Sequence, residues 1–433
     1  GKILMLTGLL MMILLGMVAL AVDIGWILVA RTQLQSASDS GSLAGGTELL
    51  PGLGASAYRT PAQVQANAEL QAVQYVAQHR AGEAAAAYIT PARDVTMGKG
   101  YLNTTTGAWK FEWGATPYNA VGVTTRRSST GTTAGDGPLP LIFGPVLGQS
   151  FSDVTVVSAA VILPASGIRI PPGSGLNSGL SPFAYDLETW KKYWRARKYY
   201  GDNGMTPEDL QINNDGHLIM DSQDLDESGA MKPLFYELVP QGNSGNMLTR
   251  RMFDDKYAVV DPQAGGPDNV VAGQDGVLEM NIYPIASESG NFGTVDIGGL
   301  DNSTAELSRQ ILTGISEEDM VNFQENKFAP QPEAPVVLQG DTGISSGLSL
   351  AIEQVLGDCK GIVLYTTVQN PGNNAEYTIV AIVGVRFLDV NFRGSQKTLV
   401  IQPCNFKDPA AVPDYEEEIG EETTFFTPLI LAR

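Results

Sequence analysis

The side chains that most often carry out catalysis are scarce in this sequence and poorly placed relative to one another. The stretch Gly343–Gly347 fits the G-x-S-x-G pattern of serine hydrolases, in which the catalytic histidine follows the serine in the chain. Both histidines, His79 and His217, come before Ser345. An Asp-Thr-Gly triplet begins at Asp341, but an aspartic protease needs two such carboxylates and the chain has no second triplet. We therefore expect no enzymatic activity, and we expect Asp341 and Ser345 to form a turn and a helix cap.

The sequence also gives little indication of a metal or cofactor site. The Asx-Gly turns within Asn213–Leu218 and Gly273–Glu279 lie in an acidic region and carry oxygen ligands of the kind that calcium prefers. Neither has the spacing of an EF-hand loop, so plain turns that lead into strands are the main interpretation, with structural calcium as the alternative. The cysteines lack C-x-x-C spacing, which excludes zinc ribbons and c-type haem. We expect no other cofactor.

The two cysteines, Cys359 and Cys404, lie in the same C-terminal block of the chain. In an oxidising compartment they would form one disulfide that closes a loop of about 45 residues, worth about 4 kcal/mol in the chain-entropy model. Two buried free thiols are the alternative.

The charge of the chain argues against nucleic acid as a partner. Its formal net charge is −20, from 47 acidic and 27 basic residues, whereas binding to phosphates needs basic patches. The densest basic cluster, Lys191–Tyr200, interleaves lysine and arginine with aromatic residues. This pattern predicts a surface helix whose aromatic side chains pack inward. The alternative is a contact between this cluster and an acidic patch on a neighbouring subunit.

A long apolar run opens the sequence. From Ile3 to Val22 there is no charged residue, and a helix of about 20 residues at about 1.5 Å per residue crosses the roughly 30 Å of a bilayer core. A secretory signal, a membrane anchor and the stalk of a pilin-like subunit all fit such a run. A signal peptide has a shorter apolar core of about 7–15 residues. Because the helical pattern continues in amphipathic form to about Leu50, we favour a retained anchor or stalk.

The sequence around the end of this run resembles a known family. Gly16–Trp26 and Ala30–Gly45 are similar to the N-terminal segment of TadG-like proteins of bacterial Flp/Tad pilus systems, with serine at positions 38, 40 and 42 where alanine is usual. Later segments resemble, more loosely, the large TadG-related proteins of planctomycete-type bacteria. These segments are 181–184, 275–284, 291–298, 302–304 and 339–345. The resemblance implies a non-enzymatic protein of the cell envelope or of a pilus.

The family and the apolar run together predict assembly through the N-terminal helix. We expect its oily half to pack with copies of itself in the core of a filament, after passing through the membrane, because burial of its large side chains favours association. Asp23 would then need a partner for its buried charge, either Lys2, the amine of Gly1, or Arg31 of a neighbour. The residues predicted to serve assembly are Ile3, Leu6, Leu10, Ile13, Leu14, Met17, Leu20, Asp23, Trp26 and Arg31.

The periodicity along the chain predicts an α+β protein. A pilin-like stalk helix over residues 1–50 is followed by an α+β domain with an antiparallel sheet over 51–163, which contains a short apolar insert from Leu139 to Gly148. A Gly-, Pro- and Ser-rich linker is predicted over 164–182, and a C-terminal, β-rich α/β domain over 183–433, with the apolar tail as a strand of that same domain. A strand added to a neighbouring subunit is the alternative for the tail.

These expectations lead to one functional hypothesis and a competitor. The first is a structural subunit of an extracellular pilus-like filament, exported through the inner membrane and partnered by copies of itself. The second is a membrane-anchored minor component of the envelope that serves pilus assembly or adhesion. In neither case is nucleic acid a partner.

Overall fold

The computed structural model divides the chain into two compact units, each treated separately below. Unit 1 comprises Gly1–Leu53, Ala57–Leu163 and Leu429–Arg433, and unit 2 comprises Gly54–Ser56 and Pro164–Pro428. The structure describes residues 2–130, 135–203, 211–212, 218–219, 236–240, 247–281, 292–298, 302–342, 344–370, 372, 375–392 and 398–432.

Unit 1 begins with one long helix, α1 (Lys2–Gly46). Leucine, methionine and alanine, all strong helix formers, fill its apolar half. The burial of α1 changes along its length. Ile3–Val22 is almost entirely exposed, whereas Ala30–Gly46 packs against a sheet and a second helix. The predicted single helix through the apolar and amphipathic halves is confirmed, four residues shorter than expected at its C-terminal end.

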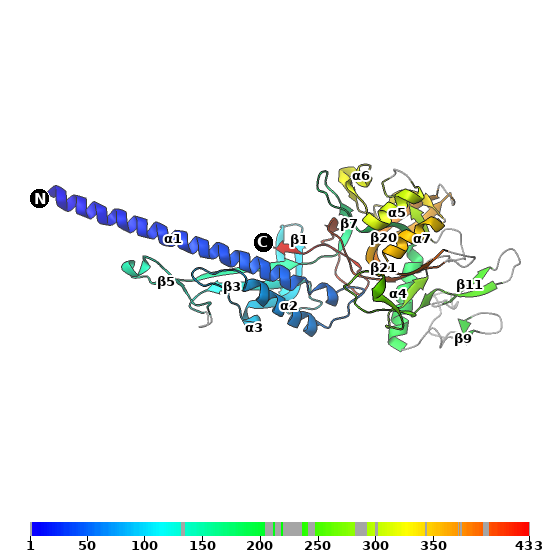
Figure 1. The fold of residues 1–433 in the computed structure, drawn as a ribbon, viewed down its shortest axis with the longest axis horizontal. Coiled ribbons are helices and arrows are strands. Elements are labelled where there is room, and N and C mark those ends of the chain that lie inside the picture. The colour runs from blue at the N-terminus through cyan, green and yellow to red at the C-terminus, as the bar shows by residue number, and fades with distance from the viewer. Residues whose placement is uncertain are drawn as a thin grey trace. The chain divides into compact units, whose positions relative to one another are not determined.

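The sheet of unit 1 has five strands in the order β2-β1-β3-β6-β26, all antiparallel. Its strands are β1 (Val95–Asn103), β2 (Ala108–Trp113), β3 (Ala120–Arg127), β6 (Val154–Val161) and β26 (Ile430–Ala432). The C-terminal half of α1 crosses β3 and β6 on one face of this sheet (Figure 1). The antiparallel α+β architecture predicted from the change of period is thereby confirmed.

A second helix, α2 (Pro61–Val76), packs on α1 beside the sheet. Thr60 closes its N-terminus in a capping box with Gln63, as the Thr-Pro start predicts. Small residues on α1 allow the close approach: a Cβ on Gly41 would lie 2.5 Å from Val76, and one on Gly45 would lie 3.1 Å from a carbonyl oxygen of α2.

Between β3 and β6 the chain forms a hairpin-like insert, hereafter the 139–152 hairpin. It consists of β4 (Leu139–Pro140), the 3-10 helix η2 (Gly144–Leu147) and β5 (Phe151–Ser152), with β4 and β5 paired. In Figure 1 the part labelled β5 lies alongside α1. The apolar insert predicted over Leu139–Gly148 is this element.

The prediction that the apolar tail forms a strand of the C-terminal domain is only partly confirmed. Its first part, β25 (Phe425–Phe426), pairs with β23 (Phe406–Lys407) within unit 2. Its last part, β26, pairs instead with β6 of unit 1, with Ile430 opposite Val161. Leu429 fills the space left by Gly46 of α1, where a Cβ would meet its side chain at 2.8 Å. Alternating apolar residues identify a strand but do not say which sheet will accept it. A free sheet edge on unit 1 decided the outcome.

Unit 2 is built around a large mixed sheet with the order β13-β16-β22-β21-β19-β17-β8-β20. Its strands are β8 (Leu180–Asp186), β13 (Phe253–Asp254), β16 (Glu279–Asn281), β17 (Phe292–Val295), β19 (Val336–Asp341), β20 (Cys359–Gln369), β21 (Ala375–Asn391) and β22 (Thr398–Pro403). Because β20 pairs with both β8 and β21, the five strands from β21 through β20 close into a ring.

Two strands of this ring, β20 and β21, are buried on both faces over much of their length, as their runs of β-branched residues predict. Along β20, Ile362 and Leu364 belong to one apolar cluster, whereas Val363 and Tyr365 belong to another. Three helices contribute to the first cluster, namely α4 (Leu187–Asn203), α5 (Thr304–Thr313) and α7 (Ser349–Gln354).

Helix α4 contains the basic and aromatic cluster. Tyr193 and Trp194 are buried in the first apolar cluster, while Lys191, Arg195 and Lys198 are exposed. The prediction of a surface helix with inward aromatic side chains is confirmed.

The predicted linker over 164–182 is partly wrong. Its first residues form β7 (Ala165–Arg169), the central strand of a three-stranded sheet with β18 (Lys327–Phe328) and β24 (Ala411–Pro413). A Cβ on Gly167 would meet Ala329 at 2.4 Å, so this glycine marks a close approach of two backbones inside a sheet. Glycine and serine are typical of loops, but here Gly167 permits tight strand packing.

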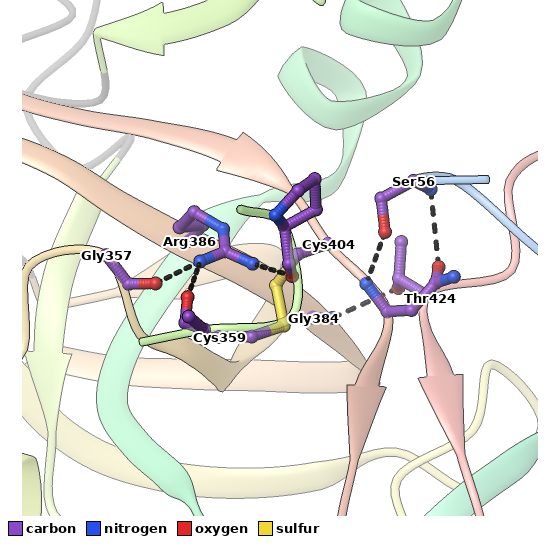
Figure 2. Close-up of a disulfide and its surroundings, with 10 residues drawn as sticks. Ser56, Gly357, Cys359, Gly384, Arg386, Cys404 and Thr424 are labelled. Carbon is purple, nitrogen blue, oxygen red and sulfur yellow. Dashed lines mark hydrogen bonds between the residues drawn. A yellow bond between two sulfur atoms is a disulfide. The ribbon is translucent and has the colours of Figure 1, made fainter. Parts of the chain in front are cut away.

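A disulfide joins Cys359 and Cys404, with their Cα atoms 6.1 Å apart. It crosses β21, because Cys359 lies opposite Arg386 on that strand and the Cys404 amide donates to the carbonyl of Gly384 at 3.1 Å. Beside it, the buried Arg386 guanidinium donates to the carbonyls of Gly357 and of Pro262, the latter at 2.6 Å (Figure 2). The bridge therefore ties β20 to the residue that follows β22, both of which pair with β21.

Replacing both cysteines by serine should lower the free energy of unfolding of unit 2 by about 2–5 kcal/mol, since the bridge restricts a long loop in the unfolded chain. Hydrogen exchange should show faster opening of β20 and β22 in the variant, with the amides of α2 as an internal control. Equal unfolding curves for the oxidised wild type and the double variant would contradict a stabilising bridge.

Candidate functional site

The exposed apolar half of α1 is the most unusual surface of unit 1. All seven predicted assembly residues from Ile3 to Leu20 are more than half exposed. Within the described part of the chain, α1 is the helix long and apolar enough to cross a membrane, and none of its most apolar stretch is buried. Exposure on this scale is unfavourable in water, so this segment must be covered by lipid or by protein.

Asp23 ends the apolar run and is almost completely buried, with 4% of its surface exposed. Its Oδ1 accepts hydrogen bonds from the backbone amides of Ile142 at 2.8 Å and Phe143 at 3.1 Å, and its Oδ2 accepts from Phe143 at 3.2 Å. Hydrogen bonds from backbone N–H groups to a carboxylate are charge-assisted and compensate for burying the charge. Asp23 therefore attaches the 139–152 hairpin to α1.

Within one chain Asp23 has partners other than the expected Lys2, amine of Gly1 or Arg31 of a neighbour, and the pairing between copies stays a prediction. The carboxylate is satisfied by amides of its own chain, 119 and 120 residues away in sequence.

Trp26 makes the second link between α1 and the hairpin. Its indole Nε1 donates to the carbonyl of Pro140 at 3.1 Å. Asp23 and Trp26 lie three residues apart, so both project from the same side of the helix. Ile24 and Leu28 on the other side of this turn are exposed, as is Val29 at its flank.

The hairpin carries a large apolar surface of its own. No charged residue occurs from Leu139 to Ser152. Ile142, Phe143, Val146 and Phe151 are exposed, Val146 to 85%. The sequence identified the insert as apolar, but its association with Asp23 could not be read from a separation of more than a hundred residues.

Two of the three serines that replace the usual alanines in α1, Ser38 and Ser42, bind the sheet. Ser38 Oγ donates to the carbonyl of Val123 at 2.6 Å, and the hydroxyl of Thr125 donates back to the carbonyl of Leu34 at 2.9 Å. Ser42 Oγ lies 3.4 Å from Ser158 Oγ, which in turn donates to Asp39. These bonds fix the amphipathic half of α1 on β3 and β6, so the exposed half projects from a rigid base.

The serine of the hydrolase-like motif serves as a cap. Ser345 Oγ accepts a hydrogen bond from the amide of Gly347 at the start of a 3-10 turn and another from the hydroxyl of Thr304. This is the role that the sequence analysis assigned to Ser345. His79 belongs to the other unit, and His217 lies outside the described residues.

Comparison with protein families identifies the N-terminal part of the chain. Residues 1–56 match the family model of putative Flp pilus-assembly TadE/G-like proteins, and residues 48–160 match that of putative Tad-like Flp pilus-assembly proteins. The N-terminal part of the chain is therefore similar to TadG-like pilus-assembly proteins. No curated protein and no solved structure matches it. The first match covers α1, and the second covers α2, the 139–152 hairpin and most of the unit 1 sheet.

Removal of the Asp23 carboxylate should release the hairpin of this TadG-like unit. Asp23→Ala leaves two amides without an acceptor and should destabilise the unit by about 1–3 kcal/mol. Asp23→Asn retains an oxygen in the place of Oδ1 and should cost less. Hydrogen exchange should rise at Ile142 and Phe143 in the alanine variant. Unchanged exchange at both amides would show that the carboxylate does not hold the hairpin.

The two segments considered for calcium have different outcomes. Asn213–Leu218 lies largely outside the described residues. In the Gly273–Glu279 segment, Asp255 accepts hydrogen bonds from the amides of Asp275 and Gly276, each at 3.1 Å. The carboxylate of Asp255 thus stabilises this turn. The residues that the structure describes contain no cluster of three or more acidic, His or Cys side chains arranged for a metal.

Glu279 in this segment is buried and accepts hydrogen bonds from the amides of Lys256, at 2.8 Å, and Tyr257. Burial raises its pKa to about 8, from 4.5, against the lowering effect of the two amides, while nearby Asp254 and Asp255 raise it further. The folded state therefore binds a proton on Glu279 at a pH where the unfolded chain does not.

The stability of unit 2 should consequently decrease as the pH rises from about 4.5 to about 8, because the stabilising proton is lost over that interval. Glu279→Gln keeps an amide oxygen as acceptor without the charge, and should flatten this dependence. Urea unfolding at both ends of the interval measures the effect. The exposed Glu333→Gln on the same unit is the matched control. The same slope in Glu279→Gln and in the wild type would contradict the assignment.

Proposed function

We propose that this TadG-like protein is a membrane-anchored structural component of a pilus-assembly system in the cell envelope. The observation that carries the proposal is the exposed run Ile3–Val22, whose length of about 30 Å matches the hydrocarbon core of a bilayer. The family matches support a place in Flp pilus assembly. The protein acts by binding and positioning, without catalysis.

The position of Asp23 favours the membrane over a filament core as the surroundings of this helix. A filament built on the predicted pairing would use the carboxylate of each copy to neutralise a cation on another. Here the carboxylate is engaged by two amides of its own chain, so lipid can surround the run without leaving a charge unpaired. The disulfide in unit 2 is consistent with an oxidising space outside the cytoplasm.

Incorporation into an extracellular filament is the second candidate function. The free apolar half of α1 supports it as well, since packing among copies of the chain would bury the same side chains as lipid does. In this case the protein passes through the inner membrane first, and copies of itself are its final partners.

Introducing a charged residue in the middle of the apolar run tests whether the protein uses this helix as a membrane anchor. Leu10→Arg should reduce the fraction of protein that resists alkaline extraction from membranes, because arginine at the centre of a spanning helix costs about 2.5–3.5 kcal/mol on insertion scales. Leu350→Arg, at a leucine of α7 that is 66% exposed, is the matched control. Equal retention of the two variants would contradict a membrane anchor.

The composition of sheared surface filaments then decides between the two candidates. A membrane component remains in the membrane fraction and is absent from purified filaments. A major filament subunit is the main band of those filaments. Finding the chain as that band would replace the first proposal by the second.

A further inference from the structure

The 139–152 hairpin combines a strongly apolar tip with a polar and tightly held base. At the base, Arg127 donates to the carbonyls of Gly137 at 2.7 Å and Ala81 at 2.6 Å, and the carboxylate of Asp136 binds Arg93 at 2.6 Å. At the tip, Val146 is 85% exposed. Such a division between a charged base and an apolar tip is typical of an element at the boundary between water and lipid.

The backbone of the tip is unusually well satisfied for an exposed loop. The amides of Ile142 and Phe143 bind Asp23, and other N–H groups of the hairpin donate to carbonyls within it. The bonds inside the hairpin are Leu141 to Ser150 at 3.0 Å, Val146 to Phe143 at 3.0 Å, Gly148 to Pro145 at 3.3 Å and Gln149 to Gly144 at 2.9 Å. Two further positions, Pro140 and Pro145, have no N–H. In lipid no water is present to bind free backbone groups, so internal satisfaction is a requirement for entry.

The hairpin is fixed where the membrane-length run ends. Asp23 and Trp26 bind it on one side of α1, whereas Ile24 and Leu28 on the opposite side and Val29 at the flank are exposed. Apolar surface therefore surrounds the helix at this level, continuous with the run that precedes it. We name this set of residues the collar, consisting of Ile24, Leu28 and Val29 of α1 and Ile142, Phe143, Val146 and Phe151 of the hairpin. Tryptophan, here Trp26, is enriched at the same depth in membrane proteins.

We propose that the collar inserts into the outer part of the bilayer, so that the hairpin is a second lipid-binding element beside the spanning helix. This inference rests on the proposed membrane anchorage of α1 and adds to it a depth and an orientation. The bound hairpin holds α1 at a fixed depth in the membrane and keeps unit 1 from rotating freely about the helix. Lipid is favoured over a protein partner because the collar contains no charged residue, the adjacent carboxylate of Asp23 is satisfied by two amides, and the collar extends a surface that already has the dimensions of a bilayer.

Depth-dependent quenching of a fluorescent label tests the proposal in the full-length protein. Single cysteines for labelling replace Val146 at the tip of the hairpin, Met12 in the run, or Val157 on β6, with the native disulfide left oxidised. Val157 is 61% exposed and serves as the matched exposed valine outside the collar. Each labelled protein is reconstituted in vesicles of phosphatidylcholine and phosphatidylglycerol that carry spin-labelled acyl chains.

The expected result is quenching at positions 12 and 146 and none at 157. Position 146 should respond most to spin labels near the headgroups, and position 12 to labels deep in the acyl chains. Quenching at 12 without quenching at 146 would overturn the collar while leaving the anchor intact. Absence of quenching at position 12 would overturn the anchor itself. A blue-shifted label at 146 that lipid spin labels do not quench would mean that protein covers the hairpin, and would also overturn the proposal.

Discussion

The carboxylate of Asp23 determines how the apolar parts of unit 1 are arranged. A buried charge must be compensated, and the two consecutive amides of Ile142 and Phe143 provide this. The same contact removes two N–H groups from water and fixes an apolar hairpin against an apolar helix. Without it, the hairpin would be attached to α1 mainly through Trp26 and would have unsatisfied amides. One side chain thus permits two lipid-compatible elements to lie together.

The base of this assembly is stiff because α1 changes its partners halfway along. Its small residues, among them Ala37, Gly41 and Gly45, allow backbone-close packing against α2 and the sheet. Ser38 adds a buried hydrogen bond to Val123 that alanine would lack. The exposed half consequently extends from an anchored helix, so that movement of its apolar surface is coupled to unit 1.

Local features of the fold were predictable because they depend on neighbouring residues. The long helix, the Thr60 capping box and the Ser303 cap of α5 follow from apolar period and capping chemistry. The pairing of Cys359 with Cys404 was predictable because the sequence contains only these two cysteines. The partner of Asp23 and the strand β7 were missed for a physical reason. Both depend on contacts across more than a hundred residues, which local pattern does not encode.

The return of the C-terminal segment explains why the part that matches the family is not a complete structural unit. The matched residues end at 160, one residue before the end of β6, whose outer neighbour is β26 near the end of the described chain. Unit 2, from Pro164 to Pro428, is thus inserted between two adjacent strands of unit 1. Insertion is tolerated where the two ends of a domain lie close together, and the pairing of Val161 with Ile430 provides such a place. Because of this pairing, the edge of the unit 1 sheet is complete only when the chain between β6 and β26 has been fully synthesised. A chain truncated after unit 2 would leave β6 as an open edge, with the groove at Gly46 unfilled, and an open edge can pair with other chains.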